Sequence, residues 1–524
     1  MQIPMSPTRI LQRAVQLYGD KTALVDGDIR RTYKEVEKRV NKMAHLLADL
    51  SPPGGRVAIL DYNTHRYLEL YFASAASGRA LLPLNTRLSL DEYAYILENA
   101  GANTLIFHAD FKEMAAELMK RLPTLKQVIS AENRTDESSN ENWITGDYER
   151  LMAQAPDTAM AFELNNENEL LNLYYTSGTT GQPKGVVLTH RNIYANALST
   201  IVSFGLTDRT TWYHIAPLFH LADAFFIWSV TFQGGCHVMQ RDFDPVQVLK
   251  TMAREKVTAA MMVPTMINFL LDVPNLSEFD LTHLEWIMVG GAPMSPANAK
   301  RMMERLGCDY ISGYGLTETC PLLAVGTLKS TLKDCPEDQR LNYITRTGLP
   351  VAGVELKVMD IHGKEVPWDG ETMGEIWVKG DNVMAEYWKL PKETEAAFTD
   401  GWFRTGDLAN VDDQGYILIV DRAKDIIISG GENIASVEIE NIVYTHPDIL
   451  ECAVFAIPDE KWGEVPKVAA VLKAGAHITP AELIEYCRDK LAGFKRPKSV
   501  EFMDQLPKTG SGKILKGKLR DRHP

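Results

Sequence analysis

The sequence of 524 residues has little of three features that would place it in a special class: long apolar runs, grouped cysteines and excess positive charge. No run of about 18 apolar residues is present to cross a bilayer. The six cysteines are scattered, with neither metal-type spacing nor disulfide density, so we expect free thiols in a reducing compartment. A formal net charge of −14 argues against general affinity for nucleic acid or anionic lipid, but it allows a local basic pocket.

Targeting segments and internal repeats are also missing. The stretch from Met1 to Asp20 lacks the apolar core of a signal peptide, so a cytoplasmic location is expected. The composition, with 45% hydrophobic and 24% charged residues, is typical of a globular protein. The length favours several domains or subdomains over a single core.

The spacing of apolar residues predicts alternating helices and strands in the first part of the chain. Residues 7–18 show helical periodicity. Two pairs have the spacing of capping boxes, Thr32 with Glu35 and Ser89 with Glu92. Strand-like runs lie between and after them, at residues 57–60, 80–84 and 104–107. This alternation predicts parallel sheet with right-handed crossovers, and short strand-like segments after Val351 predict a small β subdomain.

A loop of glycines and hydroxyls separates two strand-like runs, residues 171–175 and 186–188. Its members are Thr176, Ser177, Gly178, Thr179, Thr180 and Gly181. Successive backbone N–H groups in such a loop can point inward and form a concave seat for phosphate oxygens, and Lys184 adds a compact positive charge. The spacing is not that of the Walker motif, and a flexible hairpin turn is the alternative interpretation.

Further polar or glycine-rich segments follow strand-like runs and suggest a functional role. They are His220, the turn 290–293, the segment 313–318, Asp407, the charged cluster 421–425 and Lys513. Each has a plain alternative: a packed histidine, a tight turn, a turn aspartate or solvated charge. A hard oxygen ligand such as Glu318 suits Mg²⁺. A carboxylate such as Asp407 can accept both hydroxyl protons of a ribose.

Residues Thr176 to Gly185 resemble the phosphate-loop signature of the adenylate-forming superfamily, which includes acyl-CoA synthetases, adenylation domains and luciferases. That signature, Thr-Ser-Gly-Thr-Thr-Gly-x-Pro-Lys-Gly, is matched in full. The resemblance continues through the later segments to Pro507–Lys513, which resembles the catalytic-lysine motif Pro-Lys-Thr-x-x-Gly-Lys. It therefore covers nearly the whole chain.

The resemblance implies an α/β fold with a large N-terminal domain and a small, mobile α+β C-terminal domain. The N-terminal AMP-binding domain, residues 1–421, would consist of α/β subdomains and a small β subdomain and would hold the acid, ATP and the adenylate. Residues 422–424 would form the hinge, and residues 425–524 would form a lid that carries Lys513. Rotation about Lys424 would withdraw Lys513 for the second half-reaction.

The resemblance also assigns roles to individual residues. The catalytic set would be Lys513, Glu318, Thr176 and His220. The nucleotide and CoA contacts would come from Thr176, Ser177, Gly178, Thr179, Thr180, Gly181, Lys184, Gly291, Ala292, Pro293, Gly313, Tyr314, Gly315, Thr317, Asp407, Arg422, Lys424, Gly430 and Gly431. Thr176 and Glu318 would hold Mg²⁺. The acid pocket would be lined by His220, Phe225, Gly291 and Gly315.

Several positions depart from the superfamily pattern. Leu221 stands where amino-acid-activating domains carry an aspartate for the substrate ammonium, which argues against an α-amino acid. Ile428 and Gly430 stand where some relatives carry lysines, so contacts to CoA phosphates must come from elsewhere. Lys516 replaces a common arginine without changing the chemistry of the motif. Asp223 has two interpretations: it faces solvent, or it tunes specificity.

These features predict an acid–thiol ligase, an AMP-forming acyl-CoA synthetase that uses ATP, Mg²⁺ and CoA. The apolar run around Phe225 and Phe226, with the small Ala222 and Ala224, suggests a roomy apolar pocket for a fatty or aryl acid, and we expect a medium- or long-chain fatty acid. Three alternatives stay open: an aryl or hydroxycinnamate CoA ligase, a stand-alone acyl-adenylating enzyme that loads a carrier protein, and a nucleotide-binding module without ligase activity. The predicted partners are small molecules, without nucleic acid or a transmembrane segment, and a homodimer is left open.

Overall fold

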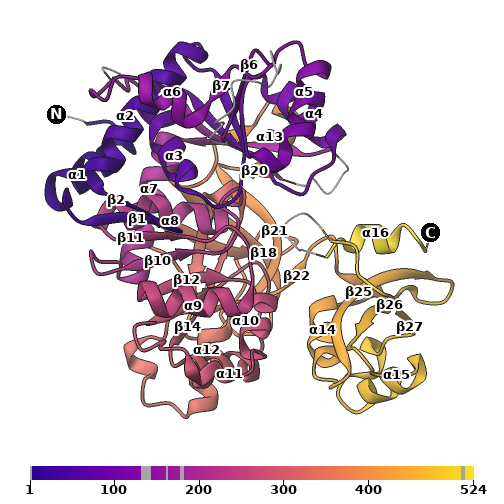
Figure 1. The fold of residues 1–524 in the computed structure, drawn as a ribbon. Coiled ribbons are helices and arrows are strands. Elements are labelled where there is room, and N and C mark those ends of the chain that lie inside the picture. The colour runs from indigo at the N-terminus through magenta and orange to yellow at the C-terminus, as the bar shows by residue number, and fades with distance from the viewer. Residues whose placement is uncertain (1–2, 132–142, 161–162, 177–181, 509–513, 524) are drawn as a thin grey trace. The chain divides into compact units, whose positions relative to one another are not determined.

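The computed structural model describes residues 3–131, 143–160, 163–176, 182–508 and 514–523. The chain divides into two compact units, which are described separately (Figure 1). Unit 1 comprises Met1–Glu355 and Lys379–Phe398, and unit 2 comprises Leu356–Val378 and Thr399–Pro524. The α/β fold class expected from the sequence is confirmed, whereas the domain boundaries around residues 422–424 stay a prediction.

Unit 1 contains a nine-stranded sheet. Its order is β16 (Leu349–Pro350), β15 (Leu322–Val325), β14 (Asp309–Gly315), β13 (Trp286–Val289), β12 (Ala259–Met262), β10 (Thr211–His214), β11 (Cys236–Met239), β1 (Thr22–Asp26) and β2 (Ile29–Thr32). The strands from β14 to β1 are parallel, and the strands at both edges are antiparallel. Because parallel strands end at the same edge, the residues that follow β10, β13 and β14 gather there.

Unit 1 also contains an eight-stranded sheet. Its order is β19 (Glu386–Tyr387), β9 (Lys184–Thr189), β8 (Leu170–Thr176), β4 (Ala80–Pro83), β3 (Arg56–Leu60), β5 (Ala102–Phe107), β6 (Gln127–Ser130) and β7 (Gly146–Asp147). The strands from β8 to β7 are parallel, as the sequence predicted. β9 is antiparallel to both β8 and β19.

Helices connect and cover these sheets. They are α1 (Thr8–Tyr18), α2 (Tyr33–Leu50), α3 (His65–Ser77), α4 (Leu90–Ala100), α5 (Lys112–Arg121), α6 (Tyr148–Gln154), α7 (His190–Phe204), α8 (Leu221–Gln233), α9 (Pro245–Glu255), α10 (Pro264–Leu271), α11 (Pro296–Leu306), α12 (Glu337–Thr345) and α13 (Pro391–Ala397). The 3₁₀ turns are η1 (Ala109–Phe111), η2 (Leu276–Glu278), η3 (Thr317–Thr319) and η4 (Ser330–Leu332). Both predicted capping boxes are confirmed at the starts of α2 and α4, where side-chain oxygens satisfy backbone N–H groups that a helix leaves unpaired.

Each sheet of unit 1 has its own apolar core. In the nine-stranded sheet, buried residues of β10, β12 and β13 pack against α9, α10 and α11, which lie next to one another (Figure 1). In the eight-stranded sheet, buried residues of β3, β4 and β5 pack against α4 and α5. These helices bury only one stripe each, which is the amphipathic pattern of a surface helix on a parallel sheet.

Two smaller sheets are formed wholly or mainly by residues of unit 2. The first has the order β17 (Val354–Met359), β18 (Gly374–Gly380), β21 (Trp402–Val411) and β20 (Phe398–Thr399), and β22 (Ile417–Arg422) pairs with β21. The second has the order β24 (Glu432–Ile434), β23 (Ile427–Ser429), β26 (Gly463–Leu472) and β25 (Ile449–Asp459), and β27 (Ser499–Phe502) pairs with β26. The helices are α14 (Ser436–Tyr444), α15 (Pro480–Arg488) and α16 (Lys516–Arg520), with the 3₁₀ turn η5 (Gly493–Lys495).

Two expectations from composition can be compared with the structure. All six cysteines are free, as predicted. Among the described residues, no helix combines the length and the apolar character needed to cross a membrane.

His190, the first residue of α7, generates a testable prediction. Its side chain is buried, and burial lowers its pKa to about 4. The folded state therefore disfavours protonation of His190. The contribution of this group to the free energy of unfolding is fully present above its pKa in the unfolded chain, about 6.5, and it is lost as the pH falls toward 4. Relative to pH 7, this one group should cost about 2 kcal/mol of unfolding free energy at pH 5.

We expect the substitution His190→Asn to reduce the loss of unfolding free energy between pH 7 and pH 5 by that amount, measured by urea denaturation at both pH values. His362→Asn, at an exposed imidazole, serves as the control. An unchanged pH dependence in His190→Asn would contradict the assignment.

Candidate active site

The two ends of the predicted phosphate loop lie side by side. Thr176 ends β8, Lys184 begins β9, and the two residues are partners in the antiparallel ladder. The loop residues between them, Ser177, Gly178, Thr179, Thr180 and Gly181, lie outside the described residues. Direct partners in such a ladder are about 5 Å apart at Cα, so the predicted hydroxyl and the predicted cation are adjacent.

Tyr387 links Lys184, which follows the predicted phosphate loop, to Glu318 of the segment 313–318. It lies on β19, which pairs with β9, and the Nζ atom of Lys184 is 5.1 Å from its ring centre. Its hydroxyl donates a hydrogen bond of 3.0 Å to Oε1 of Glu318. Burial, and then the neighbouring carboxylate of Glu318, raises the pKa of Tyr387, so the phenol keeps its proton and remains a donor.

The sequence analysis missed Tyr387. A tyrosine in a two-residue strand carries no local signal, and its two partners are far away in the chain. The pairing of β19 with β9 brings Tyr387 to Lys184, and the hydrogen bond from the N–H of Met384 to the carbonyl of Glu318 brings Glu318 to the same place.

Glu318 is held by its backbone as well as by Tyr387. It lies in η3, and its carbonyl accepts a 2.7 Å hydrogen bond from the N–H of Met384. The side-chain amide of Asn382 donates to the carbonyls of Thr319 and Leu322, at 2.8 and 2.9 Å, and so secures the turn on its other side. The carboxylate is therefore positioned by contacts from the segment that leads into β19.

The donor set fits Mg²⁺ better than a metal held by protein alone. Among the described residues there is no group of three or more histidine, cysteine or acidic side chains that could hold an ion. Mg²⁺ in nucleotide enzymes is bound through one or two carboxylates and substrate phosphates, and it keeps several waters. The carboxylate of Glu318 and the hydroxyl of Thr176 match that pattern.

The glycine turn after β13 and the glycine-rich end of β14 lie at one edge of the nine-stranded sheet. β13 and β14 are parallel neighbours, with Val289 opposite Ser312, so Gly291, with Ala292 and Pro293 after it, and Gly313, with Tyr314 and Gly315 after it, follow at the same end. Gly291 has a φ of +80°, which favours glycine. A Cβ on Gly315 would lie 1.6 Å from the carbonyl oxygen of Pro321, so only glycine fits there.

His220 stands at the N-terminal end of α8, and the apolar run that follows it is largely buried. Phe225 has only 1% of its surface exposed, and its ring lies 4.1 Å from that of Phe226, centre to centre. Ala222 is partly exposed, whereas Leu221 and the residues from Asp223 to Phe226 are buried. The predicted pocket residue Phe225 therefore packs inside unit 1.

Asp223 does not face solvent, which corrects one of the two interpretations offered for it. Its side chain is fully buried and accepts a 2.8 Å hydrogen bond from the indole N–H of Trp212. The same oxygen is 3.1 Å from Nδ1 of His214, and Nε2 of His214 is 2.9 Å from Nδ1 of His237. Position 223 is on the inner face of α8, and the charge of aspartate alone could not reveal this.

Unit 2 brings together two residues that were predicted separately for the nucleotide. Asp407 on β21 and Arg422 on β22 are partners in an antiparallel ladder, and Nε of Arg422 is 3.1 Å from Oδ1 of Asp407. Asp407 is 4% exposed, while the arginine side chain is partly open to solvent. The pair combines one buried acceptor with one accessible donor.

The predicted hinge and glycine loop have definite local structure. The carbonyl of Lys424 accepts a 3.0 Å hydrogen bond from Arg520 of α16. Gly430 and Gly431 form the turn between β23 and β24, with φ values of +60° and +87° that favour glycine. A Cβ on Gly430 would come within 2.7 Å of the Trp462 ring. Lys513 lies outside the described residues.

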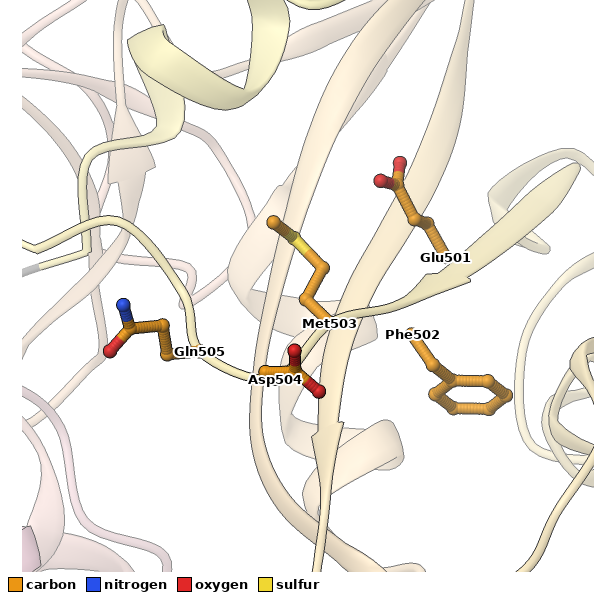
Figure 2. A pocket seen from close by; sticks show the side chains of 5 residues that line it. All are labelled: Glu501, Phe502, Met503, Asp504 and Gln505. Carbon is orange, nitrogen blue, oxygen red and sulfur yellow. The ribbon is translucent and has the colours of Figure 1, made fainter.

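A hollow in unit 2 contains none of the predicted site residues. Figure 2 shows the five consecutive residues that line it, Glu501, Phe502, Met503, Asp504 and Gln505, at and after the end of β27. Glu501 is paired with Lys467 at 3.2 Å and with His523 at 3.1 Å. Phe502 and Met503 pack against two different apolar cores. We assign no function to this hollow.

Comparison with known proteins identifies the family. The sequence profile of the AMP-binding enzyme family matches residues 11–388, and that of the AMP-binding enzyme C-terminal domain matches residues 438–513. The chain belongs to the AMP-binding enzyme family. This confirms the resemblance to the adenylate-forming superfamily.

Named relatives within the AMP-binding enzymes cover almost the whole chain. A feruloyl-CoA synthase from Amycolatopsis sp is 37% identical over 516 residues, which is 97% of each chain. A peroxisomal benzoate–CoA ligase from Arabidopsis thaliana is 34% identical and covers 99% of this chain and 93% of its own length. The crystal structure of an anthranilate CoA ligase with anthranoyl-AMP superimposes with a TM-score of 0.88 at 27% identity, over 100% of this chain and 98% of the other.

Because these relatives are named CoA ligases and synthetases, this AMP-binding enzyme is an AMP-forming acid–thiol ligase that uses ATP and CoA. It is a general acyl-CoA ligase, as the sequence predicted. The Arabidopsis relative is named as peroxisomal, so the cytoplasmic location expected for this chain stays a prediction.

The burial of Asp223 generates a stability prediction. Asp223→Ala should lower the unfolding free energy by about 2–4 kcal/mol, because it leaves the Trp212 indole and the His214 ring as buried polar groups without their acceptor. Asp223→Asn keeps an acceptor oxygen and should cost less. Urea denaturation measures both, with Asp242→Ala, at an exposed aspartate, as the control. A loss below about 0.5 kcal/mol in Asp223→Ala, as for a surface site, would contradict this role.

Proposed function

We propose that this acyl-CoA ligase activates a compact carboxylic acid, an aryl or hydroxycinnamate-type acid or a short acyl acid, in place of the medium- or long-chain fatty acid that we expected from the sequence. The observation that carries the proposal is the burial of Phe225 and Phe226. Small-molecule pockets are usually largely formed before the ligand binds, so a tunnel for a long alkyl chain should leave aromatic surface open. Relatives named for ferulate and benzoate support the compact acid.

The proposed chemistry has two half-reactions. A carboxylate oxygen attacks the α-phosphorus of ATP, the bond to the β-phosphate bridging oxygen breaks, and pyrophosphate leaves with that electron pair. The CoA thiol then loses its proton and attacks the acyl carbonyl, and AMP leaves with the electron pair of the mixed anhydride. Both steps gain most from alignment and from stabilisation of developing negative charge.

Roles for the residues follow from this chemistry. The phosphate loop and Lys184 would hold the β- and γ-phosphates, and Asp407 would accept hydrogen bonds from the ribose hydroxyls while Arg422 binds nearby phosphate or ribose oxygens. Lys513 would bridge the carboxylate and the α-phosphate in the first half-reaction only. His220 would stand beside the acid carboxylate.

Mg²⁺ would be held by Glu318 and Thr176 together with phosphate oxygens. When bound, it would supply positive charge that offsets the triphosphate. The protein's own contribution is the orientation of Glu318, which Tyr387 fixes through its hydroxyl.

A panel of acids tests the proposed function. AMP formation should require an acid and CoA, and kcat/KM should be highest for ferulate, benzoate or butyrate and lower for octanoate and palmitate. Highest activity with palmitate would overturn the compact acid. Adenylate formation without any CoA thioester would favour the carrier-loading enzyme, and no acid-dependent pyrophosphate release would leave only a nucleotide-binding module.

Lys513→Ala is the matched control, because it should lose adenylation yet form thioester from supplied acyl-adenylate.

Tyr387→Phe tests the orientation of Glu318. The variant keeps the ring beside Lys184 and removes only the donor to the carboxylate. We expect metal affinity in the presence of ATP to fall about tenfold, as for other outer partners of metal ligands. Binding of Mn²⁺ followed by electron paramagnetic resonance measures this without turnover. Tyr93→Phe, whose hydroxyl bonds to the carbonyl of Asn85, is the control. Equal Mn²⁺ affinity in the Tyr387 variant and wild type would refute the role.

A further inference from the structure

The segment between β10 and His220 is held by two buried side chains that the known motifs do not include. We propose that Asn63 and Tyr71 are positioning residues for the acid site: together they clamp the backbone of Leu218 and thereby place His220. This inference rests on the proposed role of His220 beside the substrate carboxylate. It concerns unit 1 alone.

Both the nitrogen and the oxygen of the Asn63 side-chain amide make hydrogen bonds to this segment. It lies between β3 and α3, and only 5% of its surface is exposed. Its Nδ2 donates to the carbonyls of His214 and Ala216, at 3.0 and 2.8 Å. Its Oδ1 accepts a 2.8 Å hydrogen bond from the N–H of Leu218. β10 ends at His214, so the amide replaces the strand neighbour that the following backbone lacks.

Tyr71 holds the same residue, Leu218, by its backbone carbonyl. It is fully buried on α3, and its hydroxyl donates a 2.9 Å hydrogen bond to the carbonyl of Leu218. The hydroxyl also contacts that of Tyr174. Because a phenol has one hydrogen, and Tyr71 gives it to Leu218, Tyr174 is the donor in that contact.

The contacts connect the two predicted substrate sites. Tyr174 lies on β8, close before Thr176 at the entrance to the phosphate loop. Leu218 lies close before His220, and the turn between them is closed by a 2.9 Å hydrogen bond from the N–H of His220 to the carbonyl of Pro217. The chain of contacts from β8 through Tyr174 and Tyr71 to Leu218 therefore fixes the backbone before His220 relative to the end of β8.

Such a clamp has a different effect from ordinary packing. Loss of a packing contact lowers stability without selecting one substrate. Loss of the clamp frees the backbone that leads to His220, and so it should weaken use of the acid while leaving use of ATP nearly unchanged. A displacement of about 1 Å in a positioning element is enough to reduce the rate strongly.

The same helix supplies a matched control. Tyr67 is fully buried on α3 with its ring 6.0 Å from that of Tyr71, and its hydroxyl has no hydrogen-bond partner within the part of the chain that the structure describes. Tyr67→Phe and Tyr71→Phe are therefore the same chemical change in the same core. Only the second removes a bond to the His220 segment. Asn63→Ala removes the other half of the clamp.

The experiment has two readouts on the full chain. Hydrogen exchange of the peptides that cover residues 214–221 should rise in Tyr71→Phe and Asn63→Ala, but not in Tyr67→Phe. In acid-dependent pyrophosphate exchange, the KM for the acid should rise about fivefold in Tyr71→Phe, as expected for one neutral hydrogen bond, with the KM for ATP within about twofold of wild type.

The outcomes separate this inference from the proposed function. Unchanged exchange at residues 214–221 in Tyr71→Phe would overturn the clamp, whether or not the enzyme is active. Raised exchange with an unchanged KM for the acid, or an equal rise in the KM for ATP, would overturn its role in positioning. If wild type used no acid at all, the proposed function would fail, and with it the role in positioning, whereas the clamp would still be judged by hydrogen exchange.

Discussion

The antiparallel ladder of β8, β9 and β19 is the constraint on which the predicted phosphate site depends. β9 is shared: one side pairs with β8 and closes the base of the phosphate loop, and the other side pairs with β19 and presents Tyr387. In a ladder the register decides which side chains lie on the same face. A slip of one residue would turn Lys184 away from Tyr387 and separate Tyr387 from Glu318. Backbone pairing, more than any side-chain contact, therefore assembles this part of the site.

Buried polar groups also restrict the backbone of unit 1. Asn63, Tyr71 and Asp223 all bond to backbone or side chains in the interior of unit 1, close to the segment that carries His220. Buried polar groups are costly unless they are paired, so each must be matched by a partner in a defined place. A network of this kind restricts the backbone to one conformation more strictly than apolar packing does.

Much of the fold was predictable from local patterns, because helices and parallel strands have their own periodicity. The capping boxes at Thr32 and Ser89 and the strands on either side of the phosphate loop were all confirmed. The candidate site was predictable only where a motif is contiguous in the chain. Tyr387 and Asn63 act on residues that are distant in sequence, and Asp223 looks like a surface residue in a linear pattern. For these, only tertiary pairing decides where the side chain points.

The glycine at position 315 limits how the substrate range of this chain can change. Its Cβ position is occupied by the chain's own backbone at Pro321, so natural variation or protein engineering cannot reshape the predicted acid pocket by enlarging this residue. Selectivity for a different acid has to come from positions that still have freedom, such as Ala222, the partly exposed small residue next to the start of α8. Tolerance to substitution therefore differs between the two positions: the backbone at Pro321 restricts residue 315 to glycine, whereas Ala222 can be replaced.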